Sequence, residues 1–320
     1  MEPLIPRGLD VEKLRFDPVA GTVVRTPEGE GYGFWAGGHK VFFDDQTGQF
    51  VMFYRLRSPL EAGRGARCAI ATSDDGIEFR DVWTATKEQF AANSIEVGHC
   101  VRDTKSGEWR LYVSYELRGG PWRVDLIRAP TIAALDVQSR RTVLQPFDYG
   151  LRSLKDPVVY QRDGRYFVYV AGPGRTRPTF AGNLIKAGAY EATFLAESAD
   201  GIYFPELQYA FEATNEDTWD GRRARINSVV RCGDGFLGIY DGGRTSYDMY
   251  EEWCGIAWSP DGRRFEREPL GEPWVRSPYG SVRYVYTLRR PDAFHFYYEY
   301  TREDLSHDLR VSVVAAPEGL

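Results

Sequence analysis

A phrase that recurs three times constrains the fold of this chain more than any other feature. Residues 71–79, 196–204 and 257–265 all read A-x-S-x-D-G-x-x-F. The last two copies start about 60 residues apart and the first two about twice that, so one copy is missing near residue 134. Within each copy the Asp-Gly pair predicts a tight turn, because glycine tolerates a positive φ and aspartate caps the turn. Such a unit, with strand-like runs around the turn, is typical of propeller blades rather than of one large sandwich.

Each unit contains three runs rich in Tyr, Phe and Val, separated by polar turns, as expected of β-strands. The predicted innermost strands are residues 39–44, 99–103, 157–161, 228–232 and 283–288. Five such units fill the chain, so the sequence predicts an all-β fold, a five-bladed β-propeller, as one domain over residues 1–320. Residues 22–26 are expected to close the last blade by adding a strand to it, because closure removes exposed sheet edges.

The composition excludes several classes of function. A net charge of −6 gives no basic footprint for nucleic acid. The first ten residues lack the apolar core of a signal peptide, and no run is long enough to span a membrane. The four cysteines show no C-x-x-C spacing and the histidines no ligand spacing. We therefore expect a soluble cytoplasmic protein with reduced thiols, without a metal or cofactor, that binds neither nucleic acid nor membrane.

Polar residues mark the strand ends that should meet at one mouth of the central axis. These ends are the start of each innermost strand and the end of its antiparallel neighbour. The first set is His39, the segment from Glu96 to His99, Asp156, Asn227 and Arg283. The second set is Arg55, Glu116, Ala171, Asp241 and Glu299. Exposed strand ends are often polar, which would account for part of this pattern. The crowding of so many charged groups around one axis also indicates a functional site, because burial and neighbouring charges shift pKa values.

Two of these segments resemble motifs of glycoside hydrolase family 43 and its clan relatives, which are five-bladed propellers. They are S-I-E-V-G-H-C-V at 94–101 in the second blade and L-K-D-P-V-V-Y at 154–160 in the third. The resemblance implies a glycoside hydrolase that cleaves an oligosaccharide at the axis, with Glu96 and Asp156 as catalytic carboxylates. Such cleavage requires one protonated carboxyl group for the leaving oxygen and one ionised carboxylate.

The chain also departs from the family pattern. Blade one carries His39 or a glycine where the family usually has an aspartate, and blade four has Arg225-Ile226-Asn227 where many members have an acid. The sequence therefore does not identify the general acid. Asp241, in I-Y-D-G-G-R, is the third catalytic candidate, and Glu116 or Glu299 would replace it if Asp241 only ends a strand.

Seven further residues are candidates for contact with the sugar: His39, Trp35, His99, Glu116, Asn227, Arg283 and Glu299. Trp35 suits the face of a sugar ring, but packing between blades would also account for it. Arginines near the mouth suit an anionic sugar or phosphate, or are solvated loop charges. Two other functions stay open: a glycoside phosphorylase resembling family 130, in which phosphate replaces water, and a sugar-binding propeller that has lost catalysis.

Overall fold

The computed structural model describes residues 11–174, 179–181, 184–186, 191–214, 216–245 and 249–317. Blade one consists of β2 (Trp35–Asp44), β3 (Gln49–Arg57), β4 (Gly65–Ser73) and β5 (Arg80–Thr86). Blade two consists of β6 (Ala92–Arg102), β7 (Trp109–Leu117), β8 (Trp122–Ala129) and β9 (Arg141–Leu144). Blade three consists of β10 (Lys155–Arg162), β11 (Arg165–Pro173), β14 (Glu191–Ser198) and β15 (Gln208–Phe211).

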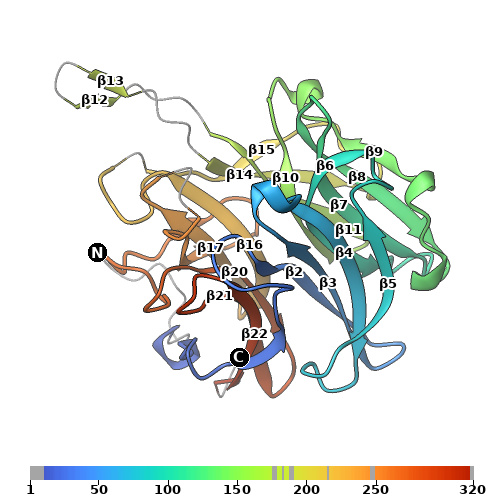
Figure 1. Ribbon diagram of the computed structural model, residues 1–320, viewed down its shortest axis with the longest axis horizontal. Helices are drawn as coiled ribbons and strands as arrows, with labels where there is room; N and C mark the ends of the chain where they lie inside the picture. The colour runs from blue at the N-terminus through green and yellow to red at the C-terminus, as the bar shows by residue number, and fades with distance from the viewer. Residues whose placement is uncertain are drawn as a thin grey trace.

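The last two blades follow the same order. Blade four consists of β16 (Arg223–Cys232), β17 (Gly235–Gly243), β18 (Trp253–Ser259) and β19 (Glu266–Arg267). Blade five consists of β20 (Val282–Arg289), β21 (Ala293–Thr301), β22 (His307–Ala315) and β1 (Thr22–Arg25). Strands within a blade are antiparallel, and β2, β6, β10, β16 and β20 surround the centre of the view in Figure 1. The predicted five-bladed propeller is confirmed.

The remaining elements are short. Five 3-10 helices are described: η1 (Val11–Leu14), η2 (Leu60–Ala62), η3 (Ile132–Ala134), η4 (Val137–Ser139) and η5 (Pro146–Tyr149). A hairpin of β12 (Thr179–Ala181) and β13 (Leu184–Lys186) is inserted within blade three. In the described part of the chain, no helix has the length and apolar character needed to cross a membrane. All four cysteines are buried and unpaired, as the sequence predicts.

The ring is closed by a strand from the beginning of the chain, as expected. In β1, Thr22 pairs with Val311 and Val23 with Arg310 of β22, so blade five combines both ends of the described chain. Single parallel pairs also connect neighbouring blades: Trp35 with His307 between blades one and five, and Glu191 with Arg223 between blades three and four.

The repeated phrase forms the turn between the third and fourth strands of blades one, three and four. In each copy the serine Oγ accepts a hydrogen bond from the glycine N–H at 2.9 Å, and the glycine has a positive φ. The aspartate carboxylate accepts a hydrogen bond from the backbone N–H two residues later at 2.8 Å. Serine, aspartate and glycine are thus all needed for one turn, which explains why the phrase recurs.

Each of these turns also docks on the preceding blade. The glycine carbonyl accepts a hydrogen bond from a buried tyrosine of that blade's second strand. The three pairs are Tyr297 with Gly76 at 2.8 Å, Tyr112 with Gly201 at 2.7 Å and Tyr169 with Gly262 at 2.7 Å. The repeat therefore fixes contacts between blades as well as the turn within a blade.

Every innermost strand contains a register shift, which begins at or next to the first residue in β10 and β20 and further along in β2, β6 and β16. The shifts lie between Gly37 and Lys40, Ile95 and Gly98, Lys155 and Val158, Ile226 and Ser228, and Arg283 and Tyr286. These five bulges interrupt the alternation of side chains, so the sequence pattern detects the strands only beyond them. The innermost strands therefore start earlier than expected, at Trp35, Ala92, Lys155, Arg223 and Val282.

Candidate functional site

The bulges place polar side chains of different blades around the axis. Glu96 lies in the bulge of β6, and Asp156 lies in that of β10 with a φ of 58°. A bulge redirects a side chain that the regular pleat would send elsewhere. Both side chains are buried among charged groups.

Glu96 is surrounded by cations. Arg55 donates a hydrogen bond to its carboxylate at 3.3 Å, and the Arg57 guanidinium lies 4.0 Å away. Burial by itself would raise the pKa of Glu96, but Arg55 and Arg57, with Lys155 and Arg64 further off, lower it to about 2. The side chain keeps 6% exposure. Glu96 is thus an ionised carboxylate at the margin of the buried cluster.

Asp156 and Asp241 share one partner, Arg225. The guanidinium of Arg225 lies 3.0 Å from the carboxylate of Asp156 and 2.6 Å from that of Asp241. Asp241 also accepts hydrogen bonds from the backbone N–H of Tyr284, at 3.1 and 3.2 Å. Both carboxylates have no side-chain exposure. The structure brings the two predicted acids together, in a buried ion cluster.

The same cluster continues toward blade five. Glu252 accepts from Arg225 at 3.1 Å and from Arg283 at 2.9 Å. Arg283 also donates from Nε to Glu299 at 2.8 Å, and the His307 Nδ1 lies 2.7 Å from Glu299. Burial would raise the pKa of Glu299, but Arg283 and His307 hold it well below its usual value. Glu299 and Arg283 are therefore ion-paired to each other.

A second group of charges borders the cluster on blade three. Lys155 lies 3.5 Å from Asp156 and 3.4 Å from Glu191, and Arg223 lies 2.9 Å from Glu191. Burial would raise the pKa of Glu191, but Lys155 and Arg223 lower it to about 2. Glu191 keeps 12% side-chain exposure and Lys155 keeps 23%.

Sequence reasoning missed several members of this cluster: Lys155, Glu191, Glu252 and Tyr284. Lys155 is next to the predicted Asp156, and Tyr284 is next to the predicted Arg283. Recognition of the bulges in β10 and β20 from the sequence would have identified both as site residues. Glu191 and Glu252 lie at the beginning of third strands, where the sequence analysis did not look for site residues. Nothing in their spacing indicates that they turn inward.

Other predicted residues lie elsewhere. Glu116 is outside the buried cluster, with 24% side-chain exposure and Arg64 at 2.7 Å. His99 accepts a hydrogen bond at Nδ1 from the Val159 N–H at 2.9 Å and lines a cavity at the opposite mouth. His39 and Asn227 are fully buried, and their side-chain polar atoms have no hydrogen-bond partner among the described residues. The expectation that His99 shares a mouth with Glu96 is therefore wrong, because the β6 bulge separates the two.

Trp35 is 2% exposed and lies between charged and aromatic neighbours. Its ring stacks on His307 at 4.9 Å, and the guanidinium groups of Arg57 and Arg283 lie 4.3 and 4.4 Å from its centroid. Its Nε1 donates to the Tyr250 hydroxyl at 3.3 Å, and Tyr250 stacks on Tyr32 at 5.2 Å. Tyr32 is 64% exposed, so this series of rings leads from the buried cluster to the surface.

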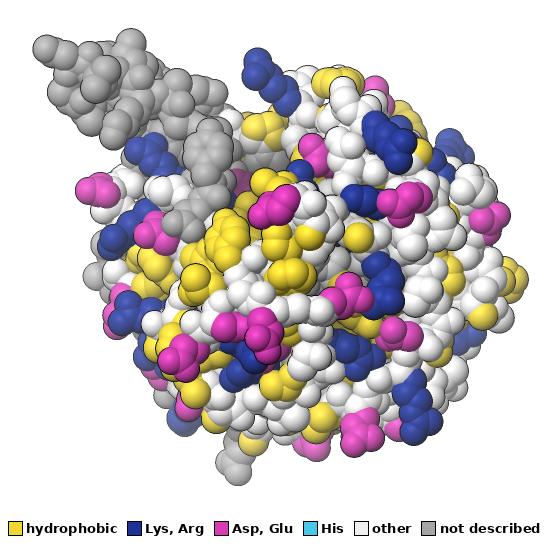
Figure 2. Space-filling view, in the orientation of Figure 1, with side chains coloured by type: hydrophobic (Ala, Val, Ile, Leu, Met, Phe, Trp, Pro, Cys, Tyr) yellow, Lys and Arg dark blue, Asp and Glu magenta, His cyan; other side chains and the backbone are white. Residues whose placement is uncertain are grey.

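Of the arginines expected near the mouth, Arg118 and Arg244 are exposed, but four others are not solvated. Arg55, Arg223, Arg225 and Arg283 are buried and lie beside carboxylates, so the cluster neutralises its own charge. Figure 2 likewise shows basic and acidic side chains interspersed over the face in view. In the described part of the chain, no group of three or more His, Cys, Asp or Glu side chains is arranged to hold a metal ion.

Comparison with known proteins gives matches in structure only. No family model and no curated protein matches the sequence. Among solved structures, the complex of BT0996 with RGII has a TM-score of 0.69 at 15% identity, and the match covers 97% of this protein and 94% of BT0996 as solved.

Two further matches have carbohydrate-active descriptions. A family 43 β-xylosidase/α-arabinofuranosidase from a compost microbial metagenome, in complex with xylotriose, has a TM-score of 0.59 at 12% identity over 92% of this chain and 94% of that chain. The β-1,2-mannobiose phosphorylase from Listeria innocua, in complex with β-1,2-mannobiose, has a TM-score of 0.60 at 14% identity. That match covers 91% of this chain and 93% of the phosphorylase chain. The chain thus has the five-bladed propeller fold of glycoside hydrolases, family 43 members among them, and a phosphorylase shares it.

Proposed function

We propose that this protein is a glycoside hydrolase that cleaves an oligosaccharide at the mouth of the axis where Glu96 lies. The observation that carries the proposal is the state of Glu96: a buried carboxylate that keeps 6% side-chain exposure, held ionised by two arginines, in the bulge of an innermost strand. An ionised carboxylate is what a glycosidase requires to activate water or to attack the sugar carbon. Two structural matches that are bound to xylotriose and to β-1,2-mannobiose support an oligosaccharide as the substrate class.

Asp156 and Asp241 act in this proposal as positioning residues. Both carboxylates are buried and ion-paired to Arg225, and Asp241 is occupied by the Tyr284 amide. Together they fix Arg225 and the Tyr284 bulge, and the Tyr284 hydroxyl accepts a hydrogen bond from Arg225 at 3.2 Å. This arrangement keeps the floor of the mouth rigid beneath the substrate, as a preorganised site requires.

The proton donor in this proposal is Glu116. It is the predicted candidate with the most exposed carboxyl group, and Arg64, which pairs with it, also lowers the pKa of Glu96. Glu299, the other candidate, is held ionised by Arg283 and His307. A group whose pKa is held that low is a poor proton donor at neutral pH.

The first experiment screens chromogenic glycosides with the parent protein and Glu96→Gln. On an active glycoside, Glu96→Gln should lose about 10² to 10⁴-fold in kcat/KM, while the exposed Glu78→Gln stays at the parental value. Folding of each variant is checked by circular dichroism. If a folded Glu96→Gln keeps parental activity, the role of Glu96 is wrong.

The role of Glu116 is tested with leaving groups of different basicity. Loss of a general acid matters most when the leaving oxygen is basic. Glu116→Gln should therefore lose far more activity on an alkyl glycoside than on a dinitrophenyl glycoside. Equal losses on both substrates would assign Glu116 to binding rather than to proton donation.

A glycoside phosphorylase is the second candidate, favoured by the cations around Glu96. Arg55, Arg57, Arg64 and Lys155 all lower its pKa, and a phosphate could use the same charges. The screen is therefore run with and without inorganic phosphate. Turnover that requires phosphate and releases a sugar phosphate would favour the phosphorylase. Binding of oligosaccharide without turnover under either condition would favour a sugar-binding propeller.

A further inference from the structure

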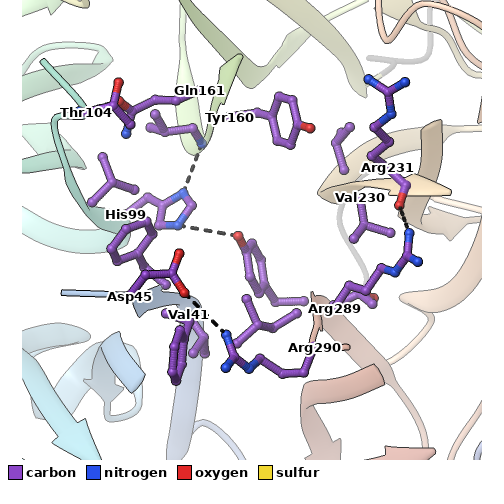
Figure 3. A pocket seen from close by; sticks show the side chains of 18 of the residues that line it. Val41, Asp45, His99, Thr104, Tyr160, Gln161, Val230, Arg231, Arg289 and Arg290 are labelled. Carbon is purple, nitrogen blue, oxygen red and sulfur yellow. Dashed lines mark hydrogen bonds and ion pairs between the residues drawn. The ribbon is translucent and has the colours of Figure 1, made fainter. Parts of the chain in front are cut away.

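A cavity of about 730 Å³ opens at the mouth opposite to Glu96. Residues beyond the bulges of all five innermost strands line it, so it is built on the rigid centre of the propeller (Figure 3). Its volume is within the range of small-molecule sites, about 300–1,000 Å³. It lies at the opposite end of the axis from the charged cluster around Glu96 and Arg225. The proposed hydrolase mechanism does not involve it.

The walls of the cavity are apolar. Val41, Val101, Val159, Val229, Val230 and Leu288 contribute aliphatic surface. Phe43 and Tyr160 add aromatic rings, and Figure 3 shows Tyr160 beside the open centre. An apolar concave wall of this kind takes the carbon framework of a ligand out of water.

A few hydrogen-bonding groups converge at the floor. His99 accepts the Val159 N–H at Nδ1, and burial lowers its pKa to about 3, so the neutral ring carries its proton on Nε2. Nε2 lies 3.4 Å from the Tyr286 hydroxyl, which leaves the Tyr286 proton to point elsewhere. Thr287 lines the cavity and is 3% exposed, and its hydroxyl has no hydrogen-bond partner among the described residues. At the floor, the hydroxyl groups of Tyr286 and Thr287 are therefore available to donate hydrogen bonds to an acceptor atom of a ligand.

The rim is cationic. Three arginines border the opening, namely Arg231, Arg289 and Arg290, whereas Asp45 is the single carboxylate among the described lining residues. Arg289 is fixed by donating to the Arg231 carbonyl at 2.9 Å, and Arg290 lies 3.8 Å from Asp45 and 3.3 Å from the centroid of Phe43. Figure 3 shows these arginines on one side of the cavity. A fixed guanidinium beside an apolar wall suits a carboxylate or similar anion.

We propose that this cavity is a second binding site, for a small organic anion with a flat apolar body. The apolar walls would enclose the body, the Tyr286 and Thr287 hydroxyls would face its inner edge, and the arginines at the rim would pair with its anionic group. The site is independent of the proposed hydrolase activity, because it lies at the other mouth and uses none of the residues around Glu96.

The test uses two probes of the same shape, 2-naphthoate and the neutral 2-naphthamide, titrated into the full-length protein by calorimetry. We expect saturable 1:1 binding of 2-naphthoate that is about tenfold tighter than that of the amide, because a charge-assisted hydrogen bond is lost in the amide. The difference should shrink as salt is raised. No binding of 2-naphthoate at millimolar concentration, or equal binding of both probes, would overturn the proposal.

Two variants locate the site. Leu288→Trp, at a half-buried lining position, should fill the cavity and abolish binding, whereas Val82→Trp on the exposed face of β5 should leave it unchanged. The double variant Arg289→Gln/Arg290→Gln should bind 2-naphthoate about tenfold more weakly, with unchanged affinity for the amide. The control pair Arg80→Gln/Arg128→Gln lies at exposed positions elsewhere.

Circular dichroism confirms that each variant is folded before titration. Glu96→Gln should bind both probes as the parent does, which separates this site from the proposed active site. Undiminished binding to a folded Leu288→Trp, or equal loss in the control variants, would place the probe elsewhere and overturn the assignment.

Discussion

Asp241 of blade four accepts hydrogen bonds from the backbone N–H of Tyr284 in blade five, at 3.1 Å to Oδ1 and 3.2 Å to Oδ2. Tyr284 has a φ of 52°, in the left-handed region that a bulky side chain rarely adopts. The Asp241 carboxylate thus holds a strained bulge in the neighbouring blade while it also pairs with Arg225. These contacts give Asp241 a structural role: it holds the Tyr284 backbone and the Arg225 side chain in place at the centre of the propeller.

Asp241→Asn should therefore lower the free energy of unfolding by about 3 to 5 kcal/mol, the usual cost of breaking a buried ion pair. Denaturant unfolding followed by fluorescence measures the change. The exposed Asp234→Asn, in the turn before the same strand, is the matched control and should change stability little. A stability loss no larger than that of the control would show that Asp241 is not structural.

The protein should lose stability as the pH falls from about 4.5 toward 2. The pKa values of Glu96 and Glu191 are lowered from 4.5 to about 2 in the folded state. A lowered folded-state pKa contributes stability above the unfolded pKa, and that contribution is lost as the folded group becomes protonated. Urea unfolding at a series of pH values tests this. Glu191→Gln should flatten the dependence in this window, whereas Glu78→Gln should not.

Lys40 should make stability rise with pH in the alkaline direction. Its ammonium is buried over the rings of Tyr284 and Tyr286, at 5.7 and 5.6 Å, and burial lowers its pKa from 10.5 to about 7. The unfolded state therefore binds more protons between pH 7 and 10.5, so unfolding becomes less favourable as pH increases across that window. Relative to the parent, Lys40→Met should be stabilised most at pH 7 and less at pH 10. The exposed Lys13→Met is the control, and parallel pH profiles for parent and Lys40→Met would contradict the prediction.

Tyr112→Phe should weaken the junction between blades two and three. The variant removes the hydroxyl that donates to the Gly201 carbonyl at 2.7 Å and leaves that buried acceptor unpaired. A loss of about 1 to 3 kcal/mol in unfolding free energy is expected. Tyr203→Phe, at a tyrosine that is 72% exposed, should be neutral. Thermal unfolding of both variants provides the measurement.

The sequence by itself determined the architecture. The phrase A-x-S-x-D-G-x-x-F encodes a turn whose hydrogen bonds are local: in its first copy the Gly76 N–H donates to Ser73 Oγ and the Ile77 N–H to Asp75 Oδ1. Local bonds of this kind leave a readable pattern because residues that are near in sequence make them. Blade number followed from the spacing of that pattern and the chain length, and the closing strand at Thr22 followed from the need to remove exposed sheet edges.

The tertiary structure decided the site. Arg225 meets Asp156 and Asp241 from different strands, and Glu252 enters from the residue before β18, where the sequence gives no sign of it. The bulges turned Glu96 inward and carried His99, three residues later, to the opposite mouth. A one-residue change of register reverses the face of a strand, and such a shift depends on the neighbouring strand. Side-chain direction at the axis is therefore set by contacts between blades, which a single sequence does not record.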